Sequence, residues 1–219
     1  MSAADPALVR VRLWLEQIVA EPALHARFVN SLARMEYVGV RKMLKARRSE
    51  ALDLDGLQHV IAEASHALRL KRAALALHGG AAEGVATFSE EHTLAGGAAE
   101  EYLQEVDRAC ESLLSHLPDA ERTEANYLLS SAAIEVRAHA FYPVYEEVLR
   151  AAGAPFSVSA IQRDEDRHLA EMRARLQALF GGDAEALLAR ALQREAAAFE
   201  RWEAAMAAAI SPAAAESPR

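Results

Sequence analysis

Apolar residues recur every three to four positions along most of the chain, which is the spacing of one face of an α-helix. In the first segment Leu8, Val11 and Leu15 follow this spacing, and Asp5 before Pro6 is typical of a helix start. The same period returns in six later segments, separated by short polar or glycine-rich stretches. The pattern predicts helices over about residues 6–20, 22–47, 53–78, 98–117, 120–152, 157–180 and 183–210.

The breaks between these segments are marked by glycine and proline. Residues 79–97 lose the helical period and contain five of the ten glycines, which predicts an unusually long loop, and loops of this length are often functional. The end of the chain, residues 211–219, is small and polar and is expected to be disordered. We therefore expect one helical domain over residues 1–210, followed by a disordered tail.

Composition supports a single all-α domain. The 219 residues are 52% hydrophobic, which is sufficient for one sizeable core, and good helix formers dominate the long segments. The formal net charge of -8 disfavours a nucleic-acid partner. Arg and Glu interrupt every apolar run, so no membrane span is expected. The single cysteine, Cys110, has no internal partner, and the N-terminal residues lack a secretory apolar segment. These features favour a cytoplasmic location.

Four of the long segments carry a glutamate in apolar surroundings, and two of these glutamates begin a Glu-x-x-His pattern. Helical residues three apart lie about 60° apart around the axis, so each pattern presents both side chains from one face. Buried carboxylates repel one another and are costly to desolvate unless cations neutralise them. This set matches the ligands of di-iron and di-manganese carboxylate bundles. The residues are Glu36, Glu63, His66, Glu135, Glu165 and His168.

The order of these residues divides the chain into two similar halves. Glu36 is followed 27 residues later by Glu63, and Glu135 is followed 30 residues later by Glu165, with 72 residues between the halves. The connections within each half are short, whereas the middle connection is long enough to cross a bundle and contains its own helix. This is the connectivity of a ferritin-like four-helix bundle with one long crossover. An N-terminal and a C-terminal helix would be additions to it.

Across roughly residues 22–180, these residues resemble the ferritin-like di-iron carboxylate oxygenases and oxidases. The second half is the closer match, because residues 164–168 have the form D-E-x-R-H found in bacterial multicomponent monooxygenases. The resemblance implies that Asp164 hydrogen-bonds the ring of His66 and fixes its orientation. In the first half Ala62 stands in the corresponding position, and the arginine is also missing.

The resemblance further implies a ligand arrangement and an activity. Glu36 and His66 would bind one metal and Glu135 and His168 the other, with Glu63 and Glu165 bridging. The metals would be two iron ions, or an Fe/Mn or Mn/Mn pair. The expected activity is oxidation of a small organic substrate with O₂, in a monomer or homodimer that receives electrons from a donor protein.

Several residues and functions remain open at this level. His139 and His59, each one turn from a ligand glutamate, are candidates for a seventh ligand, with His139 the more favoured of the two, although structural roles are the commoner explanation for each. Gly39 either opens room for substrate or oxygen, or allows close helix packing. The tyrosines of the ligand helices more often serve packing than redox chemistry. A ferroxidase that stores iron and a metal-free helical scaffold are the alternative functions.

Overall fold

The computed structural model describes residues 6–46, 52–79 and 84–211. These residues form seven α-helices, two short 3₁₀-helices and no strand, which confirms the expected all-α class. The α-helices are α1 (Pro6–Ala20), α2 (Pro22–Ala46), α3 (Leu54–Leu77), α4 (Gly96–Leu113), α5 (Asp119–Ala151), α6 (Ser159–Phe180) and α7 (Ala184–Ile210). The 3₁₀-helices are η2 (Glu90–His92) and η3 (Gly181–Asp183). The expected cap at Asp5 and the tail beyond Ser211 lie outside the described residues.

The helix ends follow the local signals in the sequence. At the start of α3 the Asp53 carboxylate accepts a hydrogen bond from the Gly56 backbone N–H at 2.8 Å, which satisfies one otherwise unpaired donor. After α3, Gly79 has φ +71°, a left-handed conformation that glycine adopts without a steric penalty. The main difference lies in α4, which begins two residues earlier and ends four residues earlier than the expected 98–117.

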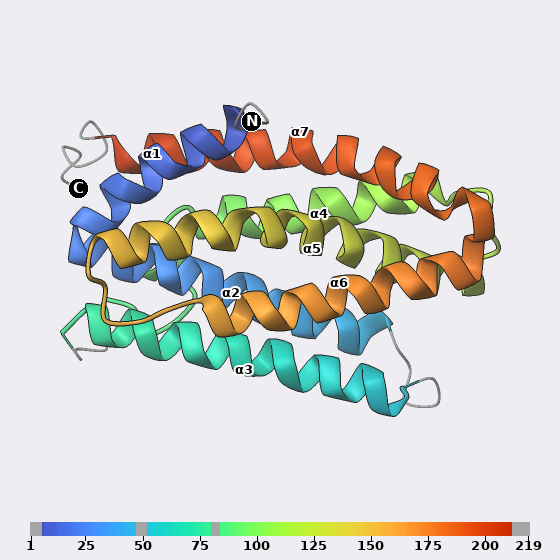
Figure 1. Ribbon diagram of the computed structural model, residues 1–219, viewed down its shortest axis with the longest axis horizontal. Helices are drawn as coiled ribbons and strands as arrows, with labels where there is room; N and C mark the ends of the chain where they lie inside the picture. The colour runs from blue at the N-terminus through green and yellow to red at the C-terminus, as the bar shows by residue number, and fades with distance from the viewer. Residues whose placement is uncertain (1–5, 47–51, 80–83, 212–219) are drawn as a thin grey trace.

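The helices pack as pairs that share one general direction (Figure 1). The most extensive packing joins α2 to α3, followed by α5 to α6 and then α4 to α7. The two ligand-bearing pairs meet through α2 with α5 and through α3 with α6. Figure 1 shows α3 at one long edge of the molecule and α7 at the other, with α5 between them. The four helices that carry the expected ligands therefore lie together.

An aromatic cluster packs α1 and α7 against α2 and α5, two of the helices that carry expected ligands. The Trp14 ring on α1 lies with its centroid 5.6 Å from Phe28, 6.0 Å from Phe141 and 5.9 Å from Trp202. These four residues belong to α1, α2, α5 and α7, and each is at most 5% exposed. Aromatic contacts of this kind bury large apolar areas and fix the relative positions of the helices. The additional terminal helices are thus part of the same core.

The crossover segment before α4, residues 84–95, is hydrogen-bonded to polar side chains of α2 and α3. Asn30, which is fully buried, donates from Nδ2 to the backbone oxygens of Thr87 and His92, at 2.8 Å each. Lys71 on α3 donates to Asn30 Oδ1 at 2.7 Å. The hydroxyl of Ser31 donates to the backbone oxygen of Leu94 at 2.7 Å. Because these bonds satisfy loop backbone groups, the segment is held in place rather than extending into solvent.

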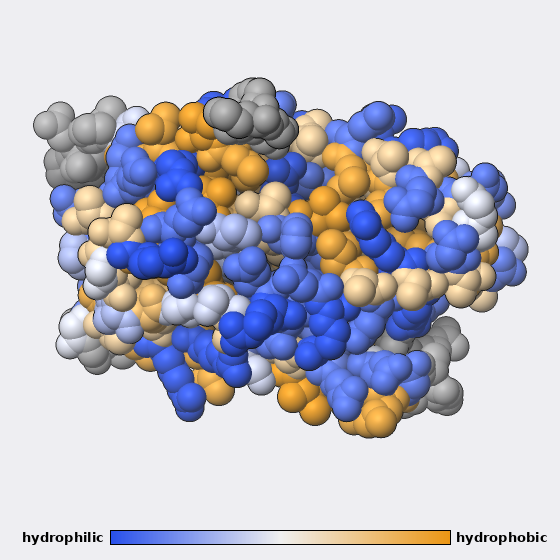
Figure 2. Space-filling model, in the orientation of Figure 1, coloured by the Kyte–Doolittle hydropathy of each residue, from blue (hydrophilic) through white to orange (hydrophobic). Residues whose placement is uncertain are grey.

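The helices of the described residues contain no apolar stretch long enough to cross a membrane. In the view of Figure 2, hydrophilic residues follow the band of surface where α3 and α6 run side by side. Apolar residues gather mainly toward α1 and α7 in the same view. The band between the two helices that each carry a Glu-x-x-His pattern is therefore polar, whereas α3 also exposes Leu54, Leu57, Ile61 and Leu68.

Candidate metal centre

The structure brings all six expected ligand side chains together in the interior of the helical body. Five of them are at most 7% exposed, and the side chain of Glu36 is 12% exposed. Each comes from the middle of its helix, where the apolar period turns it inward. They are Glu36 on α2, Glu63 and His66 on α3, Glu135 on α5, and Glu165 and His168 on α6.

Two groups of four residues in this cluster can each hold a metal ion. Within each group the candidate ligand atoms lie within 4.8 Å of one another. Glu63 belongs to both groups, so its carboxylate is placed between them. The one-histidine position consists of Glu36, Glu63, His66 and Glu165. The two-histidine position consists of His59, Glu63, Glu135 and His168.

At the one-histidine position, the His66 ring is held from its outer side. Its Nε2 and Asp164 Oδ2 are 3.1 Å apart, which is the hydrogen bond that the resemblance implied. With the proton on Nε2, Nδ1 carries the lone pair, and this atom faces Glu165 Oε1 at 3.0 Å and Glu36 Oε2 at 4.0 Å. A histidine held by a carboxylate in this way is preorganised to bind a cation.

At the two-histidine position, two rings approach the same carboxylate. His59 Nε2 and His168 Nδ1 are each 3.2 Å from Glu63 Oε1, and each is 4.0 Å from Glu135 Oε1. The two ring centroids are only 4.0 Å apart. The Nδ1 atom of His59 lies 3.3 Å from the hydroxyl of Tyr127. His59 is therefore a full member of the cluster.

Several buried polar atoms of the cluster have no hydrogen-bond partner among the described residues. Nitrogen and oxygen atoms of the cluster lie close to one another, but the angles between them do not allow hydrogen bonds to these atoms. The atoms are Glu63 Oε1, Glu165 Oε1, His66 Nδ1 and His168 Nε2. Unpaired buried polar atoms are costly, and a cation that several of them can bind at once removes this cost. Carboxylates and imidazoles together suit iron or manganese.

The carboxylates divide into two kinds when no cation is bound. Burial, together with the charges of neighbouring glutamates, raises the pKa of both Glu36 and Glu135 well above the usual value. Burial acts in the same direction on Glu63 and Glu165, but the adjacent histidines outweigh it and lower the pKa of both. Protons on Glu36 and Glu135 thus reduce the charge that cations would otherwise neutralise.

The histidines respond to the same carboxylates. Burial alone would lower the pKa of His168, but its contacts with Glu165 and Glu63 raise it to about 9. The pKa of His66 is likewise raised, because contacts with Glu165 outweigh the effect of burial. Without metal, protonated rings partly offset the buried carboxylates, and a bound cation would replace these protons.

His139, the more favoured candidate for a seventh ligand, does not join the cluster. This residue lies on the outside of α5, with its side chain 58% exposed, and pairs with Asp166 across the surface at 2.5 Å. His59, which the sequence left as the less favoured candidate, occupies the interior instead. Its signal is the extended pattern His-x-x-x-Glu-x-x-His over residues 59–66, which places three candidate ligands on one face of α3.

The tyrosines of the ligand helices have different surroundings. The Tyr142 hydroxyl donates to Glu36 Oε1 at 2.7 Å and is buried beside the cluster. Tyr127 approaches His59 as described above. Tyr37 is 45% exposed and stacks on Phe88. Tyr142 and Tyr127 therefore each contact a candidate ligand, and Tyr142 makes the shorter hydrogen bond.

An apolar cavity of about 130 Å³ adjoins the cluster. Glu36, Glu63, Glu135 and Glu165 contribute to one wall. The apolar part of the lining comes from four helices, α2, α4, α5 and α7. Of these, α4 and α7 carry none of the candidate ligands and supply Tyr102, Leu103, Phe199 and Trp202. Gly39 also lines the cavity, and an added Cβ would lie 3.7 Å from Glu63 Oε2. Its absent side chain therefore opens space beside the ligands, which favours the first explanation given for this glycine.

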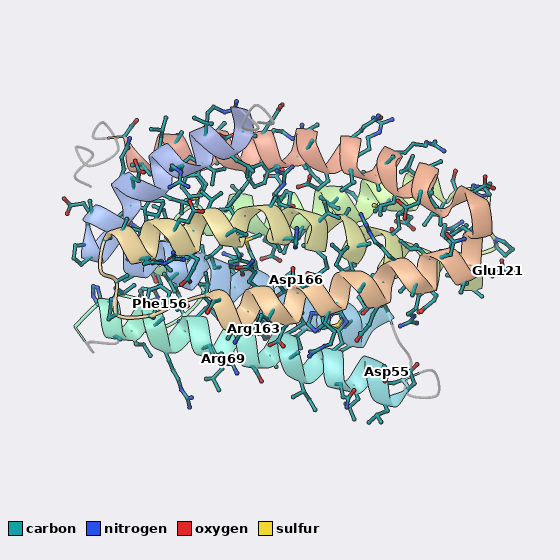
Figure 3. The ribbon with its side chains drawn as sticks, in the orientation of Figure 1. Asp55, Arg69, Glu121, Phe156, Arg163 and Asp166 are labelled. Carbon is teal, nitrogen blue, oxygen red and sulfur yellow. The ribbon has the colours of Figure 1, made fainter. Side chains whose placement is uncertain are left out.

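A second, polar pocket reaches the cluster from between α3 and α6. It is lined by Asp55, Gln58, His59, Arg167, His168 and Glu171. Figure 3 shows Asp55 on the first turn of α3. Two of the lining residues are histidines of the two-histidine position, so this pocket and the apolar cavity approach the same centre from different directions.

Neither protein-family models, nor curated proteins, nor solved structures give a significant match to this chain. The class of protein is therefore defined by its own fold and site. It is an all-helical protein with a buried cluster of glutamates and histidines that can hold metal ions.

Proposed function

We propose that this protein is a ferritin-like oxidase or oxygenase that uses two iron or manganese ions to oxidise a small organic substrate with O₂. One observation carries the proposal: four carboxylates and three imidazoles converge from four helices, and the four carboxylates border an apolar cavity. A storage protein needs the ligands but not an adjoining cavity with apolar walls. A metal-free scaffold gains nothing from burying four glutamates together.

In this proposal bound iron or manganese supplies the redox chemistry that activates O₂. The protein residues hold and tune the centre. Glu63 faces both metal positions, so its carboxylate can bridge them. Asp164 fixes the His66 ring through Nε2, and the Tyr142 hydroxyl holds the Glu36 carboxylate in position. The open coordination sites left by these ligands would be available to O₂ and substrate.

The cavity provides the place for the substrate. Its volume of about 130 Å³ is similar to that of an apolar protein cavity of about 150 Å³ that binds benzene. Apolar walls exclude water, which protects a reactive centre from side reactions. A small, mainly apolar molecule would lie against the glutamate face, with its oxidisable group toward the metals.

Metal content and O₂ consumption test this function directly. Protein loaded with iron or manganese is expected to retain about two ions per chain by elemental analysis. After chemical reduction it is expected to consume O₂ in a single-turnover assay, faster than the same concentration of free metal. Glu63→Ala removes a ligand of both positions, so it should abolish most bound metal and the O₂ consumption.

The matched control is Glu101→Ala, which removes an exposed glutamate on α4 far from the cluster. Circular dichroism should show the same helix content in both variants. Full metal content in Glu63→Ala, or no metal in the unsubstituted protein after loading, would contradict the proposed function.

A further inference from the structure

The apolar cavity and the polar pocket both adjoin the candidate metal centre, but they differ in how easily a cation could enter them. The apolar cavity is lined mainly by hydrocarbon side chains, and its basic residues Lys42 and Arg137 are each paired with a carboxylate. A hydrated divalent cation loses its water shell at high cost on entering such a space. The pocket between α3 and α6 is instead lined entirely by polar or charged side chains. A cation therefore meets the lower barrier on the α3 and α6 side.

Charges at the polar pocket favour cation capture. Asp55 and Glu171 are exposed acidic residues of its lining. Arg167 is the basic residue there, and it lies 3.4 Å from Asp164 and 3.9 Å from Glu171. The two carboxylates outnumber the one guanidinium at the outer part of the pocket, and that guanidinium is itself close to carboxylates. Hydrophilic residues also follow the band of surface where α3 and α6 run side by side (Figure 2).

The inner wall of the pocket contains a buried polar atom that no protein group satisfies. His168 is 1% exposed, and its Nε2 has no hydrogen-bond partner among the described residues. Its Nδ1 faces Glu63 and Glu165 at 3.2 and 3.3 Å, so the opposite edge of the ring, with Nε2, is the edge available to the pocket that His168 lines. An imidazole nitrogen in this place is a natural ligand for an arriving cation.

The His168 ring is also less restrained than its counterpart. The outer nitrogen of His66 is fixed by Asp164, whereas Nε2 of His168 has no hydrogen-bond partner among the described residues. The residue of α3 that corresponds to Asp164 is Ala62, whose side chain has no acceptor to offer. His168 thus offers Nε2 on the side of the pocket, while its Nδ1 lies 3.3 Å from Glu165 Oε2 on the side of the carboxylates.

We propose that the polar pocket is the entry site for the divalent cations, in which Asp55 and Glu171 capture the ion and His168 transfers it inward. The transfer exchanges oxygen ligands of the pocket for His168, whose ring releases its proton to solvent as the ion binds, and then for Glu63 and Glu135, with no change in oxidation state. This inference rests on the proposed function, because it requires the buried cluster to bind metal. It adds a transient third cation site at the surface.

The rate of metal loading tests this proposal separately from the amount bound. Metal-free protein is mixed with Co²⁺ in a stopped-flow instrument, and its visible absorption reports occupation of the buried site. In the double variant Asp55→Asn, Glu171→Gln, the loading rate constant should fall roughly tenfold, since electrostatic steering changes association rates by at least this factor. The final number of bound ions should stay the same.

Two controls show whether slower loading comes from the polar pocket itself. One tests the effect of net charge elsewhere on the protein, and the other compares narrowing of the pocket with narrowing of the apolar cavity. The double variant Glu101→Gln, Glu200→Gln makes the same change in net charge at exposed positions of α4 and α7 and should load at the unsubstituted rate. Gln58→Trp, which narrows the pocket, should slow loading, whereas Leu103→Phe, which narrows the apolar cavity, should not.

Unchanged loading in both pocket variants, or slowing by Leu103→Phe alone, would overturn the entry route while leaving the metal centre intact. A loss of final stoichiometry at an unchanged rate would also overturn it, because Asp55 and Glu171 would then support the centre itself. Failure of the unsubstituted protein to bind any Co²⁺, iron or manganese would instead remove the proposed function, and the entry route with it.

Discussion

The two positions of the metal cluster are built from equivalent parts of the two halves of the chain, yet they differ in their support. His66 is held on its outer side by Asp164 and faces three carboxylates. His168 has Ala62 in the place of that aspartate, and its outer nitrogen is unpaired. Instead, the centroid of the His59 ring lies 4.0 Å from that of the His168 ring, and His59 adds a second imidazole to this position.

This difference separates two ways of stabilising a ligand. At the one-histidine position a hydrogen bond fixes a single ring, which favours a constant geometry. At the two-histidine position an additional nitrogen raises the number of candidate ligands, while the outer nitrogen of His168, beside the surface pocket, has no partner among the described residues. We infer that the first position is specialised for precise placement and the second for exchange with solvent.

The strongest test of the comparison removes one histidine from each position. His66→Ala leaves only carboxylates at its position, so we expect that ion to be lost and the bound metal to fall to about one ion per chain. His59→Ala leaves His168 with Glu63 and Glu135, so about two ions should still bind at saturation, with weaker affinity for one of them. Elemental analysis after desalting and titration with a competing chelator measure both effects.

Equal losses in the two variants would mean that His59 is as essential as His66 and that the positions are alike. Full retention with unchanged affinity in both would show that neither imidazole binds metal. Circular dichroism again serves to exclude unfolding.

The pH dependence of stability sharpens the comparison in the metal-free protein. The folded-state pKa of His168 is about 9 against an ordinary 6.5, so protonation favours the folded form. This contribution, at most about 3 kcal/mol, is fully present below pH 6.5 and is lost as the pH rises through 9. Thermal unfolding of metal-free protein should therefore show a falling Tm over this range, and His168→Gln should flatten it.

His25 supplies a control of opposite sign outside the cluster. Burial lowers its pKa to about 4, and its Nε2 lies 2.7 Å from the Tyr145 hydroxyl. The stability linked to this neutral ring is present above pH 6.5 and is lost as the pH falls toward 4. His25→Gln should change only this acid side of the Tm profile. A high-pH decline that survives in His168→Gln would assign it to another group.

A smaller effect is expected from the aspartate that distinguishes the halves. Asp164→Ala frees the outer nitrogen of His66, and loss of such a supporting acceptor lowers metal affinity roughly 10- to 100-fold. Asp164→Asn retains an acceptor oxygen and should restore part of this affinity. In the reciprocal change, Ala62→Asp offers an acceptor near His168 and should slow the exchange of the second ion. Chelator competition and dissociation kinetics measure these effects, and an Asp164→Ala variant with altered Tm but unchanged affinity would contradict them.

Most of the helix bounds and the convergence of six side chains follow from local rules. Apolar spacing defines each helix, and glycines such as Gly79 end them. The Glu-x-x-His spacing fixes which side chains share a face, and the short connections within each half make neighbouring helices pair. These signals lie within one or two turns of the residues concerned, so the sequence alone reveals them.

The choice between His59 and His139 depends on longer-range packing. Each residue lies four positions from a ligand glutamate, which displaces it by about 40° around the helix axis and one turn along it. Whether this displacement turns a side chain inward depends on the rotation of the helix, which is set by all of its neighbours. The rotation of α3 brings His59 into the cluster, and that of α5 leaves His139 exposed. The cavity and the polar pocket likewise arise only when the helices are assembled.

The residues that line the apolar cavity come from two kinds of helix. The helices that carry the candidate ligands supply its glutamates, whereas Leu103 on α4 and Phe199 on α7 belong to helices without a candidate ligand. Under the proposed function, reactivity and selectivity would therefore be encoded in separate parts of the chain. Single substitutions at these two positions would then alter which molecules are accepted without removing a metal ligand, so a change of substrate would need few evolutionary steps.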